Sequence, residues 1–314
     1  MRIGIDIGGM SIKIGLVDDH KQIVAKKVIP TQADILSAEA VVENIGEAVL
    51  ELLKENNLTP EKCESLGVAC PGTVDSRSGV VLYSNNIHWE DVPMLALLRA
   101  KIPVPMYLAN DADAAALAEV IAGAAKDKEN AVLLTLGTGV GGGVIINGKI
   151  FAGPLRGGCE LGHTVIKHGG KLCTCGQRGC LETYASATAF MELAREKATA
   201  YPESLMNIMA GNDVTKIDGR IIFDAEKQGD AAAKEVVEQY EEDLSVGIVN
   251  FINIFRPEVV ILGGGVSAQG DYLTDALQKK VNDMCYGGAI CEVAKIVTSE
   301  LKNDAGIIGA AHLS

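Results

Sequence analysis

Residues 2–17, RIGIDIGGMSIKIGLV, decide the fold, because the same pattern returns at residues 131–146 as AVLLTLGTGVGGGVII. Each copy has the composition of a strand, a glycine-rich turn and a second strand. When Gly8 is aligned with Gly137, the second copy ends at Asn147-Gly148, a dipeptide typical of a tight hairpin. A third strand-like run follows each copy. The sequence therefore predicts one β-meander unit that is used twice.

Helical patterns separate and follow these strands. Helices are expected at 37–55, at 185–250 with an interruption at 211–218, at 272–284 and at 304–313, and further strands at 65–70 and 258–262. A duplicated meander with interleaved helices predicts two α/β lobes with an interlobe cleft. We assign residues 1–112 to an N-terminal α/β lobe, rejoined by the C-terminal helix 304–314, and residues 113–303 to a C-terminal α/β lobe with the loop 160–182.

The composition is ordinary for a globular enzyme, with 48% hydrophobic and 22% charged residues. A formal net charge of −13 argues against nucleic acid and anionic membranes as partners. No apolar run is long enough to span a bilayer, and Met1-Arg2 leads into a strand without a signal-peptide pattern. We therefore expect a cytoplasmic protein. If it binds a phosphorylated ligand, it must do so locally, through backbone amides and a bound cation.

Three glycine-rich turns follow strands and are candidates for phosphate binding: Gly8-Gly9, Gly137-Thr138-Gly139 and Gly263-Gly264-Gly265. Glycine lets backbone amides approach phosphate oxygens without a Cβ in the way. Hairpins also need glycine, so each turn alone is a weak signal. The chain has no P-loop motif, and a strand follows Gly142 where a dinucleotide fingerprint requires a helix.

Two aspartates occupy strand ends. Asp6 directly precedes the first glycine turn, where it either caps the turn or holds Mg²⁺ beside phosphates, directly or through water. Asp111 lies at a junction between a predicted strand and a predicted helix, a common place for catalytic side chains. The alternative is that Asp111 or Asp113 is the N-cap of that helix.

The segment 160–182, ELGHTVIKHGGKLCTCGQRGCLE, contains a predicted metal site. His163, Cys173, Cys175 and Cys180 are a full tetrahedral set for Zn²⁺ with no open coordination position. The alternative is a disulfide or a few buried thiols, but Cys173 and Cys175 are too close in sequence to bridge comfortably. Because Glu160 and Glu182 flank the set, we expect the metal to shape a pocket in which these acids bind a ligand.

These residues resemble the ROK family of sugar kinases and sugar-responsive repressors over essentially the whole chain. The matching motifs are DIGG, VACPGTVD, NNIHW, NDADAAA, LGTGVGGG, ELGH, CTCGQRGCLETYAS and ILGGGV. The resemblance implies the two-lobed actin/hexokinase/ribonuclease-H-like α/β fold. It also implies an ATP-dependent kinase acting on the 6-hydroxyl of a hexose, most simply glucose, in a homodimer or homotetramer.

The resemblance assigns a role to each matching position. Asp111 is expected to be the catalytic base. The expected sugar ligands are Asn86, Asn110, Glu160, His163 and Glu182. The residues expected to hold Mg²⁺–ATP are Asp6, Gly8, Gly9, Ser11, Gly137, Thr138, Gly139, Gly263, Gly264 and Gly265. Zn²⁺ is structural, with one ring nitrogen of His163 on the metal and the other facing the sugar.

Two alternatives stay open at this point. A kinase for N-acetylmannosamine, fructose or a β-glucoside would use nearly the same residues. A sugar-sensing repressor would need a helix-turn-helix ahead of the first strand, for which Met1 leaves no room. The chain also departs from the family pattern twice. Met10 stands where threonine is usual, which leaves Ser11 as the nearest hydroxyl, and Cys159 stands where glycine is usual.

Overall fold

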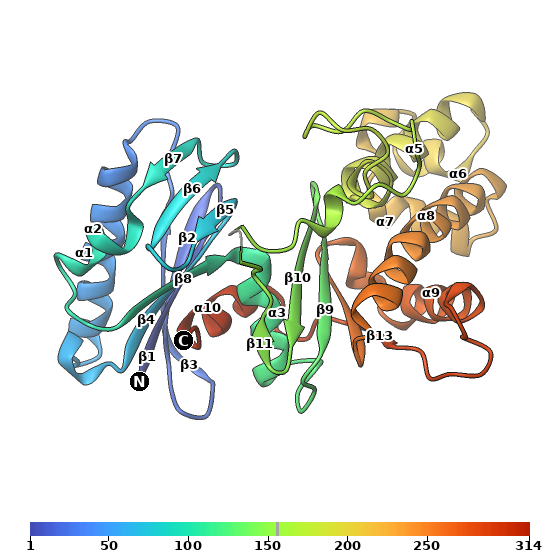
Figure 1. Cartoon of the computed structure of the whole chain (residues 1–314). Coiled ribbons are helices and arrows are strands. Elements are labelled where there is room, and N and C mark those ends of the chain that lie inside the picture. Colours follow the sequence, from blue (N-terminus) through green and yellow to red (C-terminus); the bar gives the residue numbers. More distant parts are fainter. Residues whose placement is uncertain (155–156) are drawn as a thin grey trace. The chain divides into compact units, whose positions relative to one another are not determined.

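The computed structural model describes residues 1–154 and 157–314. By its internal contacts the chain divides into two compact units. The first unit comprises Met1–Leu133, Gly143–Cys159 and Glu300–Ser314, and the second comprises Leu134–Gly142 and Glu160–Ser299. The lobe boundaries expected at residues 112 and 303 stay a prediction. Each unit is described by itself below (Figure 1).

The duplicated β-meander is confirmed. The first sheet has the order β3-β2-β1-β4-β8, built from β1 (Arg2–Ile7), β2 (Ser11–Val17), β3 (Ile23–Pro30), β4 (Ser65–Cys70) and β8 (Met106–Asn110). The second has the order β11-β10-β9-β12-β13, built from β9 (Ala131–Leu136), β10 (Val140–Ile146), β11 (Lys149–Ile150), β12 (Val259–Gly263) and β13 (Lys295–Thr298). In both orders the three meander strands lie side by side and two later strands extend the sheet.

A third, smaller sheet belongs to the first unit. It is antiparallel, with the order β5-β6-β7, and comprises β5 (Thr73–Asp75), β6 (Val80–Ser84) and β7 (Trp89–Val92). Short 3₁₀ helices occur along the chain at η1 (Pro60–Lys62), η2 (Leu161–His163), η3 (Val214–Lys216), η4 (Val266–Gln269) and η5 (Lys302–Asp304).

Helices of the first unit cover the first sheet on both faces. They are α1 (Ala38–Glu55), α2 (Met94–Arg99), α3 (Asp111–Ala122) and α10 (Ala305–Ala311). Alternate residues of a strand point to opposite faces. Ile3, Ile5 and Ile7 therefore share a buried cluster with α1 residues, whereas Gly4 faces α10. The predicted helices 37–55 and 304–313 are confirmed, with Ser37 as the N-cap of α1.

Glycine lets α10 lie directly on the strands. A Cβ on Gly4 would lie 2.0 Å from the Ile307 carbonyl oxygen, and one on Gly67 would lie 1.7 Å from that of Ala310. Neither neighbour is a flexible side chain, so a larger residue would have to push the helix backbone away. The close approach explains why β1 and β4 each carry a glycine in an otherwise apolar strand.

We predict that Gly67→Ala destabilises the protein by about 3 kcal/mol or more, because overpacking against backbone forces the helix to shift. Urea unfolding measures this. The matched control is Gly219→Ala, where a Cβ would meet no atom within 4 Å and the glycine lies in the first turn of a helix. Equal stability of the two variants would contradict the packing described.

The second unit is mainly helical. Its helices are α4 (Glu182–Ala185), α5 (Ala187–Ala200), α6 (Leu205–Met209), α7 (Gly219–Lys227), α8 (Ala231–Phe255) and α9 (Asp271–Met284). The interruption expected at 211–218 is present, but the region also breaks at 201–204 and 228–230. Phe190 joins three of these helices, since its ring centroid lies 4.4 Å from that of Tyr240 and 5.2 Å from that of Phe223.

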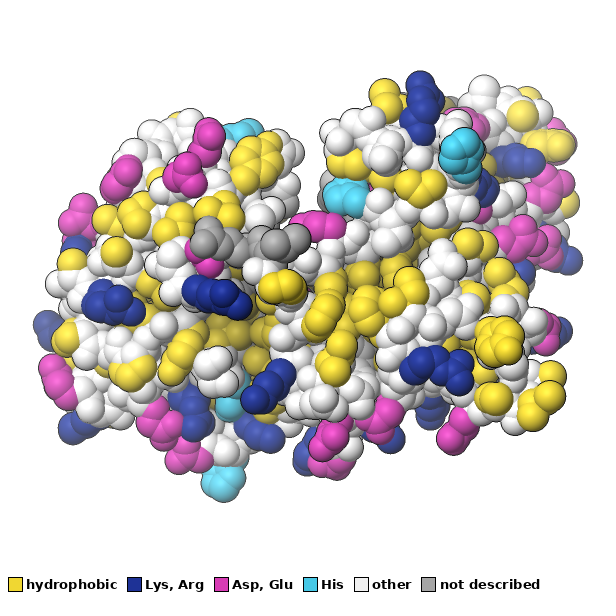
Figure 2. All heavy atoms as spheres, viewed as in Figure 1, with side chains coloured by type: hydrophobic (Ala, Val, Ile, Leu, Met, Phe, Trp, Pro, Cys, Tyr) yellow, Lys and Arg dark blue, Asp and Glu magenta, His cyan; other side chains and the backbone are white. Residues whose placement is uncertain are grey.

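The surface carries charges of both signs. On the face drawn in Figure 2, acidic and basic side chains are interspersed among apolar ones. Among the helices that the structure describes, none combines the length and the apolar character needed to cross a bilayer. All eight cysteines are free thiols. Outside the segment 160–182, Cys63, Cys70 and Cys285 are buried, Cys159 is partly exposed and Cys291 is exposed.

Candidate active site and metal centre

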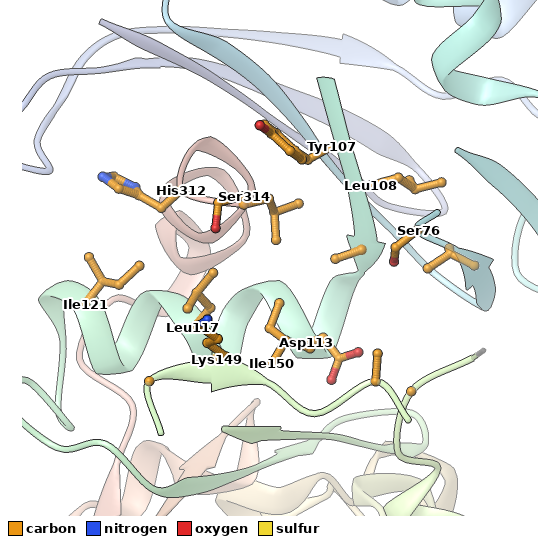
Figure 3. A pocket seen from close by; sticks show the side chains of 16 residues that line it. Ser76, Tyr107, Leu108, Asp113, Leu117, Ile121, Lys149, Ile150, His312 and Ser314 are labelled. Carbon is orange, nitrogen blue, oxygen red and sulfur yellow. The ribbon is translucent and has the colours of Figure 1, made fainter. Parts of the chain in front are cut away.

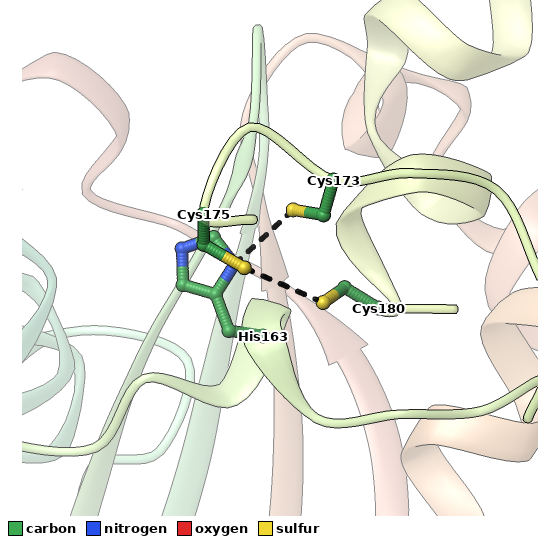
Figure 4. A group of neighbouring side chains, drawn as sticks. All are labelled: His163, Cys173, Cys175 and Cys180. Carbon is green, nitrogen blue, oxygen red and sulfur yellow. Dashed lines mark hydrogen bonds between the residues drawn. The ribbon is translucent and has the colours of Figure 1, made fainter. Parts of the chain in front are cut away.

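His163, Cys173, Cys175 and Cys180 come together in the second unit (Figure 4). Their ligand atoms all lie within 4.8 Å of one another. Cys173 Sγ is 3.6 Å from His163 Nδ1, and Cys175 Sγ is 3.7 Å from Cys180 Sγ. A tetrahedral zinc with ordinary bond lengths has S···S edges of about 3.8 Å and S···N edges of about 3.5 Å. The donor set therefore fits a four-coordinate zinc ion.

Backbone geometry brings the four ligands together. The amide of Cys173 donates to Gln177 O at 2.8 Å, which folds the segment into a tight turn. An isolated bridge pairs Val165 with Cys180. Gly179 has φ +86°, and a Cβ there would lie 1.8 Å from Lys167 O. The thiols are too far apart for a disulfide, whose sulfur atoms are separated by about 2.05 Å.

The thiols differ in how readily they lose a proton. Burial raises the pKa of Cys180 to about 12, whereas the backbone amide of Gln177 lowers the pKa of Cys175 below its ordinary value. A metal ligand must be the thiolate, so metal binding has to release these protons. Metal affinity is therefore expected to fall as the pH is lowered.

We predict that Cys175→Ser loses stoichiometric zinc and lowers the melting temperature by about 5 °C or more, since a closed structural site contributes directly to folding. Elemental analysis and thermal unfolding measure the two effects. Cys291→Ser is the matched control, because Cys291 is exposed and outside the cluster. Chelated protein that holds no zinc and keeps the wild-type melting temperature would contradict the prediction.

The junction of β8 and α3 orients Asp111 in the first unit. Asn110 is the N-cap, since its Oδ1 accepts from the amides of Ala112 at 2.8 Å and Asp113 at 3.3 Å. The alternative in which Asp111 or Asp113 caps this helix is therefore wrong. Asp111 is the first helical residue, and its Oδ1 accepts from the Ala112 amide at 2.9 Å. The helix N-terminus favours the charged carboxylate.

The remaining expected sugar ligands lie in both units. In the first, Asn86 is exposed and its backbone oxygen lies beside Gly9, while Asn110 Nδ2 donates to Gly72 O at 3.0 Å. In the second, Glu160 is exposed and immediately precedes η2, which ends at His163. Glu182 Oε1 lies 3.7 Å from Cys173 Sγ, so the metal loop and Glu182 are brought together.

The first glycine turn is closed by the Gly8 amide, which donates to Ser11 O at 3.0 Å. Met10 stands 91% exposed at this turn. Beside it, Lys13 Nζ lies 3.0 Å from Asp6 Oδ2. Sequence reasoning missed Lys13. The signal was available in the hairpin register, which sets Lys13 opposite Asp6.

The two other glycine turns lie against each other in the second unit. A Cβ on Gly264 would be 2.3 Å from Leu136 O, directly before the turn at Gly137. A Cβ on Gly137 or on Gly265 would meet nothing within 4 Å, so these positions leave room beside the backbone. Such openings suit the approach of phosphate oxygens to backbone amides.

A cavity of about 450 Å³ lies elsewhere in the first unit (Figure 3). Leu117 and Asp113 of α3, Tyr107 of β8, Lys149 of β11 and His312 after α10 contribute to its lining. Burial lowers the pKa of His312, whose Nδ1 lies 2.8 Å from Ile308 O. None of the expected site residues lines this cavity.

Comparison with known proteins identifies the class. Residues 2–314 match the model of the ROK family, and the chain belongs to that family. It is 37% identical to a glucokinase of Thermotoga maritima, covering 99% of this chain and 96% of that one. It is 34% identical to a glucokinase of Streptomyces coelicolor, covering 100% of this chain and 97% of that one.

Solved structures of ROK-family proteins are similar to this chain. A ROK glucokinase from Streptomyces griseus, in complex with glucose and AMPPNP, has a TM-score of 0.81 and 32% identity, covering 100% of this chain and 98% of that one. A ROK transcriptional regulator, a homologue of the E. coli MLC protein, has a TM-score of 0.85 and 26% identity over 99% of this chain but 76% of that one. The predicted actin/hexokinase-like α/β fold is confirmed.

Proposed function

We propose that this protein is an ATP-dependent sugar kinase that phosphorylates glucose at its 6-hydroxyl. The observation that carries the proposal is the similarity to glucokinases at 34–37% identity over the whole chain. The position of Asp111 at a helix N-terminus and the complete His–Cys donor set support it. An assay that couples ADP formation to sugar phosphorylation tests it directly.

The chemical roles follow from the side chains. Asp111 accepts the proton of the 6-hydroxyl while that oxygen attacks the γ-phosphorus, and the bond to ADP breaks. Sugar hydroxyls are held by Asn86, Asn110, Glu160, His163 and Glu182. Backbone amides of the three glycine turns, with Ser11 and Thr138, hold the phosphates. Asp6 would hold Mg²⁺, directly or through water, and the bound ion would neutralise phosphate charge.

The metal site fits this scheme as a structural element. His163 Nδ1 faces the thiols, so its second ring nitrogen, Nε2, is available to a ligand hydroxyl. Metal ligation at one nitrogen fixes the tautomer at the other. The zinc ion would therefore act by orienting His163.

We predict that Asp111→Asn lowers kcat by about a hundredfold to ten-thousandfold and leaves glucose affinity largely unchanged, because the amide hydrogen-bonds but cannot take the proton. Kinetics and calorimetry measure the two quantities. Asp127→Asn is the control, since Asp127 is exposed beyond the other end of the same helix and has a positive φ that asparagine tolerates. Near-wild-type turnover of Asp111→Asn would show that Asp111 is structural only.

Glucose is expected to be the best substrate, and deoxy analogues clearly worse, because a carboxylate that loses its hydroxyl partner stays desolvated. Cys159 stands where the family usually has glycine, and its Sγ lies 3.4 Å from Phe151 O. This extra bulk favours glucose over N-acetylmannosamine. Values of kcat/KM for glucose, mannose, N-acetylmannosamine, fructose and a β-glucoside decide the order. A clear preference for N-acetylmannosamine, fructose or a β-glucoside would contradict the assignment of glucose and make that sugar the substrate.

A sugar-responsive regulator is the second candidate, because xylose repressors are among the relatives. The Caldicellulosiruptor bescii xylose repressor is 28% identical over 98% of this chain and 76% of its own length. The net charge of −13 disfavours DNA as a partner. A DNA-retardation assay beside the kinase assay separates the two functions.

Assembly and location complete the proposal. Family resemblance favours a homodimer or homotetramer, which light scattering can measure. Eight free thiols fit a reducing compartment, the cytoplasm, in which the cluster would not be oxidised.

A further inference from the structure

The turn between β9 and β10 is held by residues that follow the metal loop. The Val140 amide donates to Glu182 Oε2 at 3.0 Å. Gly139 lies so close to this carboxylate that a Cβ there would be 2.3 Å from Oε2. The carboxylate therefore occupies the space that a side chain at position 139 would fill.

Two further hydrogen bonds join the same segments. The Ala187 amide donates to Gly137 O at 2.8 Å, and Thr188 Oγ1 donates to Thr138 O at 2.9 Å. Residues 182–188 thus form hydrogen bonds with three positions, Gly137, Thr138 and Val140. The residues before His163 approach it as well, since a Cβ on Gly162 would lie 2.0 Å from Val140 O.

Glu182 is tied to the cluster through the chain. Only Leu181 separates it in sequence from Cys180, which is fully buried, and its Oε1 faces Cys173 Sγ at 3.7 Å. A zinc-bound thiolate has no proton to donate to this carboxylate, so the coupling runs through the short segment from Cys180 to Glu182. Any change that moves Cys180 has to move Glu182 or break its contact with the Val140 amide.

We infer that Glu182 is a positioning residue that couples the metal cluster to the glycine turn of residues 137–142. The inference rests on the proposed function, in which this turn binds nucleotide phosphates. It gives Glu182 a role beyond holding a sugar hydroxyl. Zinc would then order the nucleotide-binding backbone as well as His163, which is proposed to bind the sugar.

Hydrogen–deuterium exchange of the full chain tests the coupling without any need for catalysis. Removing zinc from the wild-type protein with a chelator should speed exchange in peptides covering 137–142 about tenfold or more, because the Val140 amide loses a charge-assisted bond. Reloading zinc should restore protection. Zinc-dependent protection confined to 160–182, with 137–142 unchanged, would overturn the inference.

Variants separate Glu182 from general loosening. Glu182→Ala should exchange rapidly at 137–142 in both its zinc-loaded and its zinc-free form, while exchange at 171–180 stays zinc-dependent. Glu192→Ala, an exposed acid on α5, should behave as wild type, and Thr188→Val should weaken the turn but keep its zinc dependence. A protected turn in Glu182→Ala would also overturn the inference. If Glu182→Ala does not fold, the comparison of wild-type protein with and without zinc decides alone.

Calorimetric titration with ATP in the absence of sugar measures the effect on nucleotide affinity. Glu182→Ala should bind ATP about fivefold or more weakly, whereas a residue that only holds sugar would leave ATP affinity unchanged. Loss of sugar affinity alone, with normal exchange at 137–142, would therefore refute the coupling and leave the proposed kinase intact. If no sugar is phosphorylated, the exchange measurement still decides.

Discussion

Close approach of backbone to backbone, at positions where only glycine fits, is the constraint on which the structure depends. Gly4 and Gly67 let α10 lie on the first sheet, and Gly264 lets the third glycine turn lie against Leu136. Gly162 does the same between η2 and Val140. In each contact a carbonyl group occupies the space that a Cβ would need. At these four positions glycine is a packing requirement, whereas at Gly137 and Gly265 it leaves room beside the backbone.

The acidic character of the chain makes local chemistry decisive. With a net charge of −13, the protein has no overall attraction for an anionic nucleotide. In the proposed function, amide groups at the glycine turns and a cation held near Asp6 would supply the attraction. Lys13 already supplies one positive charge at Asp6, in a pair whose side chains are 28% and 15% exposed. Met10 offers no hydroxyl at this turn, which leaves Ser11 as the nearest one.

Much of this could be predicted from the sequence because the signals are local. The repeated strand–turn–strand pattern predicted both meanders, and four ligands within 18 residues of sequence predicted the cluster. Contacts that depend on side-chain reach between distant segments were not predictable. Asn110 caps α3 because the helix begins at Asp111, directly after the last strand residue, a boundary that the pair Asn110-Asp111 alone does not show. The link from Glu182 to Val140 spans 42 residues and no motif encodes it.

The cluster's closed coordination limits what a metal there can do. Three thiolates and one imidazole fill a tetrahedral zinc, which leaves no position for a substrate or water. Any influence on phosphoryl transfer must then pass through residues that the metal fixes. His163 offers one route, through its second ring nitrogen. Glu182 offers the other, because it follows Cys180 by two residues and its Oε2 accepts from the Val140 amide. A structural metal at this cluster would therefore act on function through the two side chains that it keeps in place.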